Sequence, residues 1–400
     1  MNQREMSSPS GTKKTGNEFR YPNNVELIRG GKDYFNRLVK LIDAARQCIH
    51  LQVYILDNDE TGNEVADALV RAAARKVEIY VMADGYASQG LEDEYIQRLT
   101  DASINFRFFK PVFKSSYFYF GRRMHHKVVV ADSSLALVGG MNISNKYNDM
   151  PGKKAWLDFA VYVEGVVAED LCILCWKTWN GYASGMPTFT CENKVPINGL
   201  EGNANIGIRS RRNDWVRGKN QISKTYMTMF HNAQSHITIL SSYFIPGRVI
   251  RRNIRDAIKR GVIIKVIVAG LSDLALSKAA ERFMYDWLLR NGVQIFEYQD
   301  NILHGKLAVC DDQWMTIGSY NVNDLSAYAS IELNLDIQDA AFAAYTDQQL
   351  EKIIAENCIP ITRETHLRSK NIFKQFSRWF SYKFTRLIFK LFTFYFKQEK

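Results

Sequence analysis

The sequence predicts an α/β protein of two similar α/β/α domains related by pseudo-twofold symmetry, with mixed, mostly parallel sheets and one active site at the interface. Three observations support this fold class. A polar motif occurs twice, the same order of strands and helices precedes both copies, and the chain is long enough for two domains. Its 400 residues, of which 46% are hydrophobic, suffice to fill two sizeable cores.

The duplicated motif occupies residues 124–142, MHHKVVVADSSLALVGGMN, and 303–321, LHGKLAVCDDQWMTIGSYN, which align without a gap. The shared positions are His125, Lys127, Asp132, Gly139 and Asn142 in the first copy, and His304, Lys306, Asp311, Gly318 and Asn321 in the second. Because packing alone does not readily produce two copies at identical spacing, we interpret these residues as a functional set. His126 aligns with Gly305 and is therefore the expendable histidine. The remaining histidines are predicted to be ordinary core or surface residues: His50, His231, His236 and His366.

The periodicity of the first copy predicts two strands around a tight turn. Residues 128–130 and 135–138 are apolar runs of strand length, and the turn-forming residues 132–134 separate them. Successive side chains of a strand alternate between faces, so His125 and Lys127 are expected on one face and His126 on the other.

The segments upstream of each motif define the two domains. CIHLQVYIL, GNEVADALVRAAARK and VEIYVMADG precede the first motif, and SHITILSSYF, RRNIRDAIKRG and VIIKVIVAG precede the second. This strand–helix–strand order predicts βαβ units and a largely parallel sheet in each half. The expected organisation is a disordered tail over 1–24, domains over 25–195 and 196–362, and a C-terminal helix over 363–400. The aromatic and basic insertion 110–123 is either a packed loop or a substrate-entry lid.

Composition restricts the class of protein and its partners. The six cysteines have scattered spacings, which is typical of a reducing compartment, and the CxxC of Cys172 and Cys175 is predicted to be core. No apolar run reaches the length of about 18 residues that a transmembrane helix needs. The net charge of +10 indicates an anionic partner.

The pattern of the C-terminal segment indicates what kind of anionic partner this is. Its aromatic and aliphatic residues share one helical face: Phe373, Phe376, Phe380, Phe384, Leu387 and Leu391. Its basic residues surround the other face: Lys374, Arg378, Arg386, Lys390 and Lys397. Such a helix suits the headgroup region of an anionic membrane, which we favour over packing against the second domain. A nucleic-acid-binding tail would not need so many phenylalanines.

The motif residues together suit a phosphodiester. Lys127 and Lys306 can neutralise its non-bridging oxygens, while Asn142 and Asn321 can donate hydrogen bonds to them. If the halves pack about a pseudo-twofold axis, the two histidines face each other across one phosphate. One can then attack phosphorus while the other protonates the leaving alcohol, which gives a phosphohistidine intermediate. No metal-ligand spacing accompanies the motifs, so neither a metal nor another cofactor is expected.

The pattern HxKxxxxD followed by GGxN or GSxN, present twice, resembles the phospholipase D superfamily. The flanking segments ADGYAS, WLDFAVYVEG, YFIPG and NGVQIFEY are similar to those of bacterial cardiolipin synthases without N-terminal transmembrane helices. This resemblance extends over residues 25 to 360 and implies two phospholipase D-like domains.

The resemblance also implies residue roles. His125 becomes the nucleophile and His304 the general acid and then base, while Lys127 and Lys306 bind phosphate. Asp132 and Asp311 are structural or orienting. The family uses a carboxylate beyond each motif to hold the second nitrogen of the histidine, and Asp158 and Glu332 match those positions. Leu325 replaces an arginine that many relatives carry, which is expected to alter headgroup contacts.

The implied activity is transfer of a phosphatidyl group from one phosphatidylglycerol to another, with release of glycerol. Phosphatidylethanolamine is a further candidate substrate, and no nucleic acid is expected. An alternative is hydrolysis of phospholipid or nucleic acid by the same residues. A noncatalytic membrane-binding module is a third hypothesis, which the two intact motifs disfavour. The expected location is the cytoplasmic face of the cell membrane, as a peripheral protein.

Overall fold

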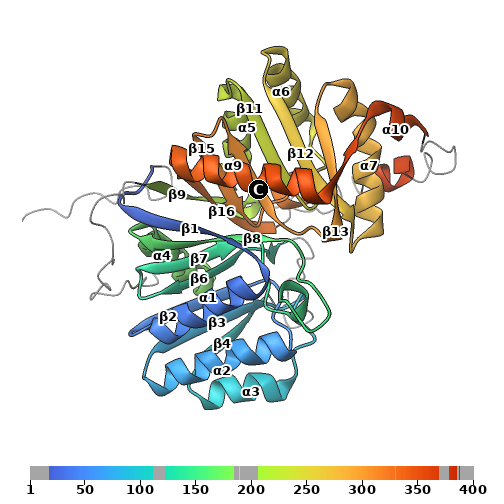
Figure 1. The fold of residues 1–400 in the computed structure, drawn as a ribbon. Helices are drawn as coiled ribbons and strands as arrows, with labels where there is room; N and C mark the ends of the chain where they lie inside the picture. The colour runs from blue at the N-terminus through green and yellow to red at the C-terminus, as the bar shows by residue number, and fades with distance from the viewer. Residues whose placement is uncertain are drawn as a thin grey trace, which may run out of the picture.

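The computed structural model describes residues 18–110, 122–183, 189, 206–328, 330–368, 378–384 and 387. Two α/β domains lie against each other, the first below the second in Figure 1. The tail over 1–17, most of the 110–123 insertion and most of the predicted boundary around residue 195 lie outside the described residues. The side chain of Leu325 lies outside them as well.

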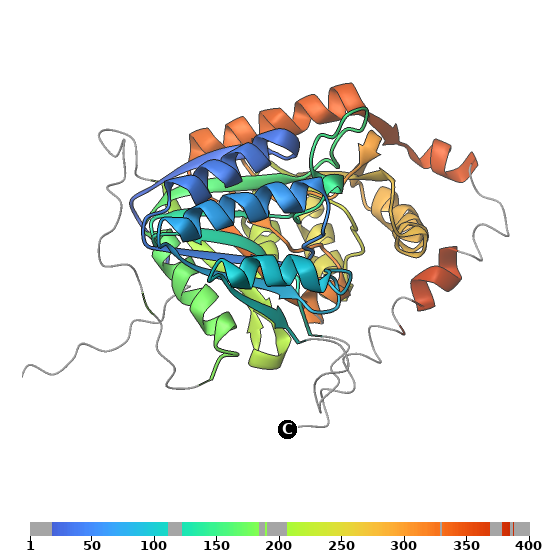
Figure 2. The ribbon, with the colours of Figure 1, turned by 90° about the horizontal axis from the view of Figure 1, so that it is seen from below.

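The described part of the first domain contains a seven-stranded sheet with the order β1-β8-β7-β6-β2-β3-β4. Its strands are β1 (Asn23–Arg29), β2 (Cys48–Val53), β3 (Glu78–Asp84), β4 (Asn105–Phe109), β6 (Lys127–Ala131), β7 (Leu135–Gly139) and β8 (Phe159–Gly165). Figure 2 shows three helices over the outer face of this sheet: α1 (Gly31–Ala44), α2 (Glu60–Ala74) and α3 (Asp93–Asp101). The helix α4 (Val167–Trp179) packs on the inner face.

The second domain repeats this plan. The main path of its sheet is β10-β9-β16-β15-β14-β11-β12-β13-β17. The strands are β9 (Gly207–Asp214), β10 (Lys219–Asn220), β11 (His236–Ser241), β12 (Ile263–Leu271), β13 (Gln294–Ile302), β14 (Lys306–Cys310), β15 (Trp314–Gly318), β16 (Ser330–Gln338) and β17 (Cys358–Ile361). The helices are α5 (Gln221–Asn232), α6 (Arg248–Lys259), α7 (Ala275–Arg290), α8 (Asp324–Tyr328), α9 (Ala340–Asn357) and α10 (Arg363–Arg368). Short 3₁₀ turns are η1 (Asn145–Tyr147) and η2 (Trp215–Arg217).

The sheets are mixed, as predicted, but the predicted parallel majority is wrong. Between the named strands of the described residues, parallel pairing is confined to β2-β3-β4, β11-β12-β13 and the contact of β16 with β5 (Arg123–Met124). The other strand pairs are antiparallel. The reason is that each motif is itself a hairpin, and the strand after it returns beside it. The βαβ pattern upstream therefore describes only one side of each sheet.

The surroundings of the motif strands explain why their sequences are continuous apolar runs. Val128 and Val130 of β6 face a core between the two domains, whereas Val129 and Ala131 face the core under α1 and α2. The strand β14 alternates in the same way between the interdomain core and the core under α5 to α7. Both faces of each motif strand are thus buried, which requires apolar residues at every position. Helices α4 and α9 complete the interdomain core.

The C-terminal segment is described in part. Residues 378–384 are helical, and the Tyr382 ring stacks on Phe283 of α7 with centroids 4.8 Å apart. Tyr382 is 8% exposed. Among the described helices, none is long and apolar enough to cross a membrane.

Candidate active site

The two motif histidines lie at equivalent positions before the central strands of the two sheets. His125 precedes β6, and His304 precedes β14. The backbone of each is attached to the opposite domain: the His125 amide donates to Ile331 O at 3.0 Å, and the His304 amide donates to Leu157 O at 2.7 Å. These contacts bring the two motifs together at the domain interface.

Each histidine is held by a carboxylate from the opposite domain. His125 Nδ1 lies 2.9 Å from Glu332 Oε2, and His304 Nδ1 lies 2.7 Å from Asp158 Oδ2. Both carboxylates are completely buried. Because a carboxylate only accepts hydrogen bonds, Nδ1 carries the proton, and the neutral ring presents an Nε2 lone pair. The family resemblance identified both carboxylates in the sequence. It did not indicate that each one contacts the histidine of the opposite domain.

The two motif lysines are buried beside the histidines. Lys127 Nζ donates to the carbonyl of His125 at 2.6 Å. Lys306 Nζ donates to the carbonyl of His304 and, at 3.0 Å, to Ser242 Oγ. Burial lowers the pKa of Lys127 to about 7 and that of Lys306 to about 8. Lys306 further lowers the pKa of Lys127, whereas Glu332 opposes both shifts. Two ammonium groups in one buried site are an arrangement that suits an anion.

Burial also favours the neutral form of both histidines. It lowers the pKa of His304 to about 4, with Lys306 adding to the effect and Asp158 opposing it. The pKa of His125 is lowered by burial as well, and there Glu332 opposes the shift. Burial alone would raise the pKa of Asp158, but Lys306 and His304 hold it below its ordinary value. At neutral pH the unliganded site thus contains neutral imidazoles.

Asp132 and Asp311 lie at the far ends of the motif strands from the histidines. Asp132 accepts hydrogen bonds from the amides of residues 46, 47 and 48 at 2.8 to 3.0 Å. Asp311 accepts from the amides of residues 234, 235 and 236 at 2.8 to 2.9 Å. Each aspartate therefore fixes the loop that enters the neighbouring strand, and neither contacts a motif histidine or lysine in the described contacts.

The motif asparagines have different surroundings. Asn142 Oδ1 accepts from the Ile55 amide at 3.1 Å, and Nδ2 donates to the Tyr147 hydroxyl at 2.8 Å. That hydroxyl lies 3.4 Å from His304 Nε2. Asn321 Oδ1 is buried and has no hydrogen-bond partner among the described residues. His126 lies apart from this network, with Nε2 2.9 Å from Gln52 Oε1.

Sequence reasoning missed several residues of the site. Tyr54 packs edge-on against His125 at 4.8 Å between centroids, and Tyr147 packs similarly against His304 at 5.1 Å. Ser242 and Ser319 contact Lys306 and Glu332, respectively. Only Ser319, inside the quoted GSxN, carried a sequence signal; the others lie outside the repeated positions.

The glycine-serine difference between the motifs lies directly at the carboxylates. Ser319 Oγ donates to Glu332, while its counterpart Gly140 lies against Asp158. A Cβ at Gly140 would come within 2.4 Å of Asp158 Oδ1. The first motif therefore requires glycine here, and the second uses the added side chain as a hydrogen-bond donor.

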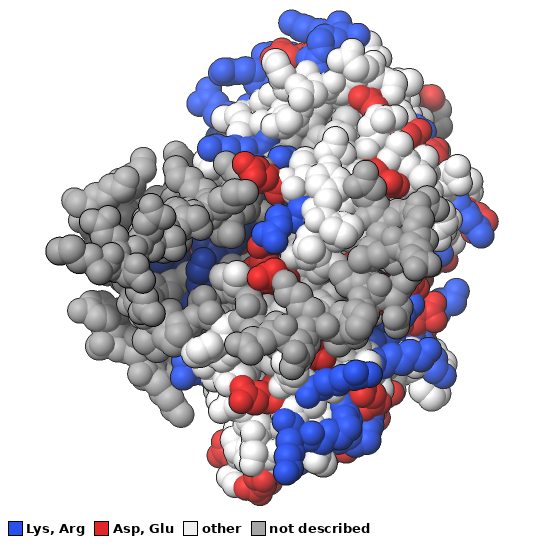
Figure 3. All heavy atoms as spheres, turned by 90° about the vertical axis from the view of Figure 1, so that its left-hand side faces the viewer, with Lys and Arg blue, Asp and Glu red and all other residues white. Residues whose placement is uncertain are grey.

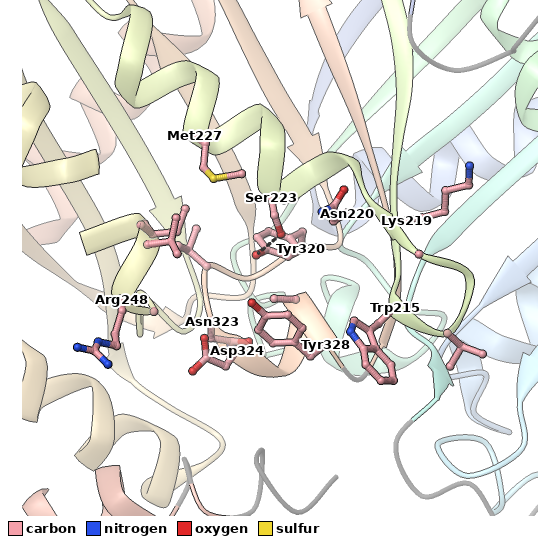
Figure 4. A pocket seen from close by; sticks show the side chains of 17 residues that line it. Trp215, Lys219, Asn220, Ser223, Met227, Arg248, Tyr320, Asn323, Asp324 and Tyr328 are labelled. Carbon is pink, nitrogen blue, oxygen red and sulfur yellow. Dashed lines mark hydrogen bonds between the residues drawn. The ribbon is translucent and has the colours of Figure 1, made fainter. Parts of the chain in front are cut away.

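A cavity of about 740 Å³ lies beside the loop of the second motif (Figure 4). Its apolar lining includes Trp215, Val216, Met227, Val249, Ile250 and Val322. Tyr320, next to Asn321, lies at its centre in the view and hydrogen-bonds Ser223 at 3.3 Å. Lys219 and Arg248 line it as well, with their charged ends directed away from Tyr320. Among the described lining residues there is no motif histidine or lysine.

A duplicated α/β fold with two histidine-lysine hairpins around one interdomain site defines the phospholipase D superfamily. The family model described as cardiolipin synthase, PLD-like domain, matches residues 38–152 and 226–354, and the chain belongs to this family. The predicted superfamily and fold class are thereby confirmed, apart from the strand directions noted above.

Named relatives agree with this membership. The chain is 34% identical to Cardiolipin synthase B of Shigella flexneri over 343 residues, which are 85% of this chain and 82% of that protein. The same identity and coverage hold for Cardiolipin synthase B of Escherichia coli strain K12. In fold, the chain is similar to the crystal structure of phosphatidylserine synthase from Haemophilus influenzae Rd KW20, with a TM-score of 0.71, 15% identity, and coverage of 92% and 94%.

Proposed function

We propose that this protein is a phosphatidyltransferase of the cardiolipin synthase type, which moves a phosphatidyl group between two phosphatidylglycerol molecules and releases glycerol. One observation carries the proposal: two histidines, each oriented by a buried carboxylate of the opposite domain, share one site with two buried lysines. The relatives named Cardiolipin synthase B, which match most of the chain, support the lipid substrate.

In the first step, His125 Nε2 attacks the phosphorus of the donor lipid. The new N–P bond replaces the P–O bond to glycerol, and His304 gives its proton to the departing glycerol oxygen. His125 suits attack because its side chain is 18% exposed against 11% for His304. His304 Nε2 faces the Tyr147 hydroxyl at 3.4 Å, which can hold the proton-carrying ring in place.

In the second step, His304 accepts the proton of a hydroxyl group of the second phosphatidylglycerol. That oxygen forms the new P–O bond as the N–P bond to His125 breaks, which restores the neutral His125 and the protonated His304 with which the first step began. Glu332 and Asp158 keep the reacting Nε2 atoms aimed at the phosphate, and the lysines stabilise its non-bridging oxygens. Asp132 and Asp311 act by positioning the motif strands.

The charges of the site support this order of reaction steps. A bound phosphodiester favours the charged form of both lysines. The two ammonium groups then balance the two carboxylates, so the charge of the phosphodiester itself remains uncompensated. Protonation of His304 compensates that charge, and a nearby anion favours the protonated imidazole. Substrate binding therefore favours the protonated form of His304, which acts as the general acid and which the unliganded site lacks.

The cavity beside the second motif is our proposed site for part of the acceptor lipid. Its apolar lining suits a hydrocarbon segment, and Lys219 and Arg248 at its boundary suit an anionic headgroup. Tyr320 and Val322, the chain neighbours of Asn321, line the cavity, so a lipid bound there would lie beside the loop of the second motif.

We further propose peripheral binding at the cytoplasmic face of the cell membrane through the C-terminal segment. Trp379, Phe380 and Phe384 are 42%, 52% and 40% exposed, while Tyr382 anchors the segment on α7. Exposed aromatic side chains of this kind suit the headgroup region. On the face shown in Figure 3, basic side chains gather at the top and at the lower right, and acidic side chains lie among them.

Phosphatidylglycerol vesicles provide the decisive test of the activity. The purified protein is incubated with them in the presence of a chelator, and the lipids are resolved by mass spectrometry. We expect cardiolipin and an equal amount of glycerol. Phosphatidic acid alone would indicate hydrolysis. Absence of turnover would refute phosphatidylglycerol as the donor, and phosphatidylethanolamine and nucleic acid would then be tested as substrates.

Vesicle sedimentation tests the membrane proposal separately. Phe380→Ser with Phe384→Ser should weaken binding to vesicles of phosphatidylglycerol by about tenfold, because two exposed rings no longer enter the headgroup region. Phe189→Ser is the matched control, since Phe189 is 59% exposed but lies outside the segment. Equal binding by the double variant and the wild type would contradict the proposed surface.

A further inference from the structure

A second group of chemically active side chains lies at the opposite end of the second sheet from the active site. His236 begins β11, Asp312 lies in the turn between β14 and β15, and Asp347 lies on α9. His236 Nε2 is 3.4 Å from Asp312 Oδ1 and 3.5 Å from Asp347 Oδ2. One ligand atom from each of the three residues lies within 4.8 Å of the other two.

The facing atoms are buried but unsatisfied. His236 Nε2 and Asp312 Oδ1 have no hydrogen-bond partner among the described residues, and the Asp347 oxygen nearest to His236 is Oδ2. Asp347 is only 9% exposed. The separations of 3.4 and 3.5 Å exceed the usual 2.7–3.2 Å of an N–H···O hydrogen bond. A native protein rarely leaves such atoms without a partner, so this group requires an explanation.

The neighbouring hydrogen bonds indicate how the ring nitrogens of His236 are used. Ser235 Oγ donates to Asp311 Oδ1 at 2.8 Å and lies 3.0 Å from His236 Nδ1. Since the hydroxyl proton is directed to Asp311, Nδ1 is the donor to Ser235. Nε2 is therefore the ring nitrogen available to a metal ion. This carboxylate–serine–histidine chain resembles the outer-shell contacts that orient metal-bound imidazoles.

We propose that His236, Asp312 and Asp347 bind a divalent first-row transition ion, for which Zn²⁺ is the best match. Zinc takes nitrogen and carboxylate ligands at about 2.0–2.2 Å, and a tetrahedral arrangement then separates ligand atoms by about 3.3–3.6 Å. The two histidine–carboxylate separations have this size. Calcium and magnesium prefer all-oxygen sites with more ligands, so they fit the donor set less well. Water completes the fourth position.

The site would tie α9 to the start of β11 and the motif turn, two segments that the hydrogen bonds of Asp311 already join. Its ligands come from the start of β11, the motif turn and α9, and α9 forms part of the interdomain core. The ion thus stabilises the second domain and takes no part in the reaction. The sequence analysis interpreted His236 as an ordinary histidine. It could not associate His236 with Asp347, because Asp347 lies on a helix far along the chain.

The first domain provides an internal comparison. The strand registers pair Ile237 with Cys310 in one domain and Ile49 with Ala131 in the other. Cys48 therefore occupies the position of His236, and Ser133 that of Asp312. The first domain lacks this carboxylate-histidine group at the equivalent described positions. The cluster is a property of the second domain and does not follow from the fold alone.

Calorimetry with the full-length protein and Zn²⁺ alone tests the proposal. The protein is first stripped with a chelator and dialysed under reducing conditions. We expect one ion per chain and a higher unfolding temperature in its presence. His236→Ala and Asp347→Asn should weaken binding by at least about tenfold, whereas His231→Ala, which removes an exposed histidine of α5, should bind like the wild type.

Asp312→Asn is the mildest variant for this test. Asp312 has φ +53°, a left-handed conformation that asparagine also tolerates, so the turn should persist while one ligand is weakened. Circular dichroism of the ion-free variants verifies their fold. Absence of zinc binding by the wild type would overturn the proposal and leave a proton shared by the three groups. Wild-type affinity in both Asp312→Asn and Asp347→Asn, or equal loss in His231→Ala, would overturn it too.

Discussion

In the first domain Gly140 brings its backbone against Asp158, whereas in the second domain Ser319 donates a hydrogen bond to Glu332. The shorter carboxylate approaches a glycine closely, and the longer carboxylate is supported by a hydroxyl. Since each carboxylate serves the opposite histidine, His304 and His125 have different surroundings within a pseudo-symmetric frame. The comparison shows how a duplicated motif can give two chemically unequal imidazoles, as nucleophile and acid require.

Removing a motif histidine should cause the largest loss of activity. His125→Ala and His304→Ala are each expected to lower phosphatidyl transfer by about 10⁴-fold or more, because nucleophilic and acid-base groups act as a unit. Radiolabelled substrate distinguishes the two: labelling of the protein should vanish in His125→Ala and remain detectable in His304→Ala. Labelling that persists in His125→Ala and vanishes in His304→Ala would reverse the roles.

Making the first motif resemble the second should be the next largest disturbance. Gly140→Ser places a Cβ within 2.4 Å of Asp158 Oδ1, so Asp158 must move and release His304. We expect kcat to fall by about 10²–10³-fold, as displaced orienting groups typically cause. Steady-state kinetics and the pH profile measure this, with Gly90→Ser as the control because that glycine has open space around it. An unchanged pH profile and kcat would show that the close approach is unimportant.

The buried lysines predict opposite pH trends for anion affinity and stability. Burial moves the pKa of Lys127 from 10.5 to about 7, so the anion-binding charge is lost as pH rises above 7, and affinity for phosphate should fall by up to about tenfold per pH unit. The unfolded lysine stays protonated to about pH 10 and binds more protons in this window. Stability of the anion-free protein should therefore rise with pH from 7 to 10. Calorimetry and urea unfolding measure the two trends, and Lys127→Met should reduce both. Parallel trends would contradict the assigned protonation.

Removing the hydroxyl from the second motif should have the smallest effect. Ser319→Ala deletes one of the hydrogen bonds to Glu332 but leaves its contact with His125, so we expect a loss in kcat of about tenfold. Kinetics measured beside Gly140→Ser sharpen the comparison. A loss as large as that of Gly140→Ser would mean that the hydroxyl is as important to Glu332 as the glycine is to Asp158.

The repeated hairpin was the part of the fold that the sequence predicted well, because its apolar runs, turn residues and spacing are local. The direction of most strand pairs was not predictable from the upstream βαβ pattern, since β8 and β16 return beside the motifs through long-range packing. Likewise, matching residues could locate Asp158 and Glu332 but not their partners. Tyr147 and Ser242 escaped notice because only the folded chain brings them to His304 and Lys306.

The exchange of carboxylates across the interface has a consequence for biosynthesis. A growing chain completes the first domain before the second, so His125 leaves the ribosome long before Glu332 has been added. Each half alone contains a histidine without its orienting group and an orienting group without its histidine. Reactivity is thus tied to completion and docking of both halves, and an unfinished chain or a proteolytic fragment has no assembled dyad with which to attack the lipids around it.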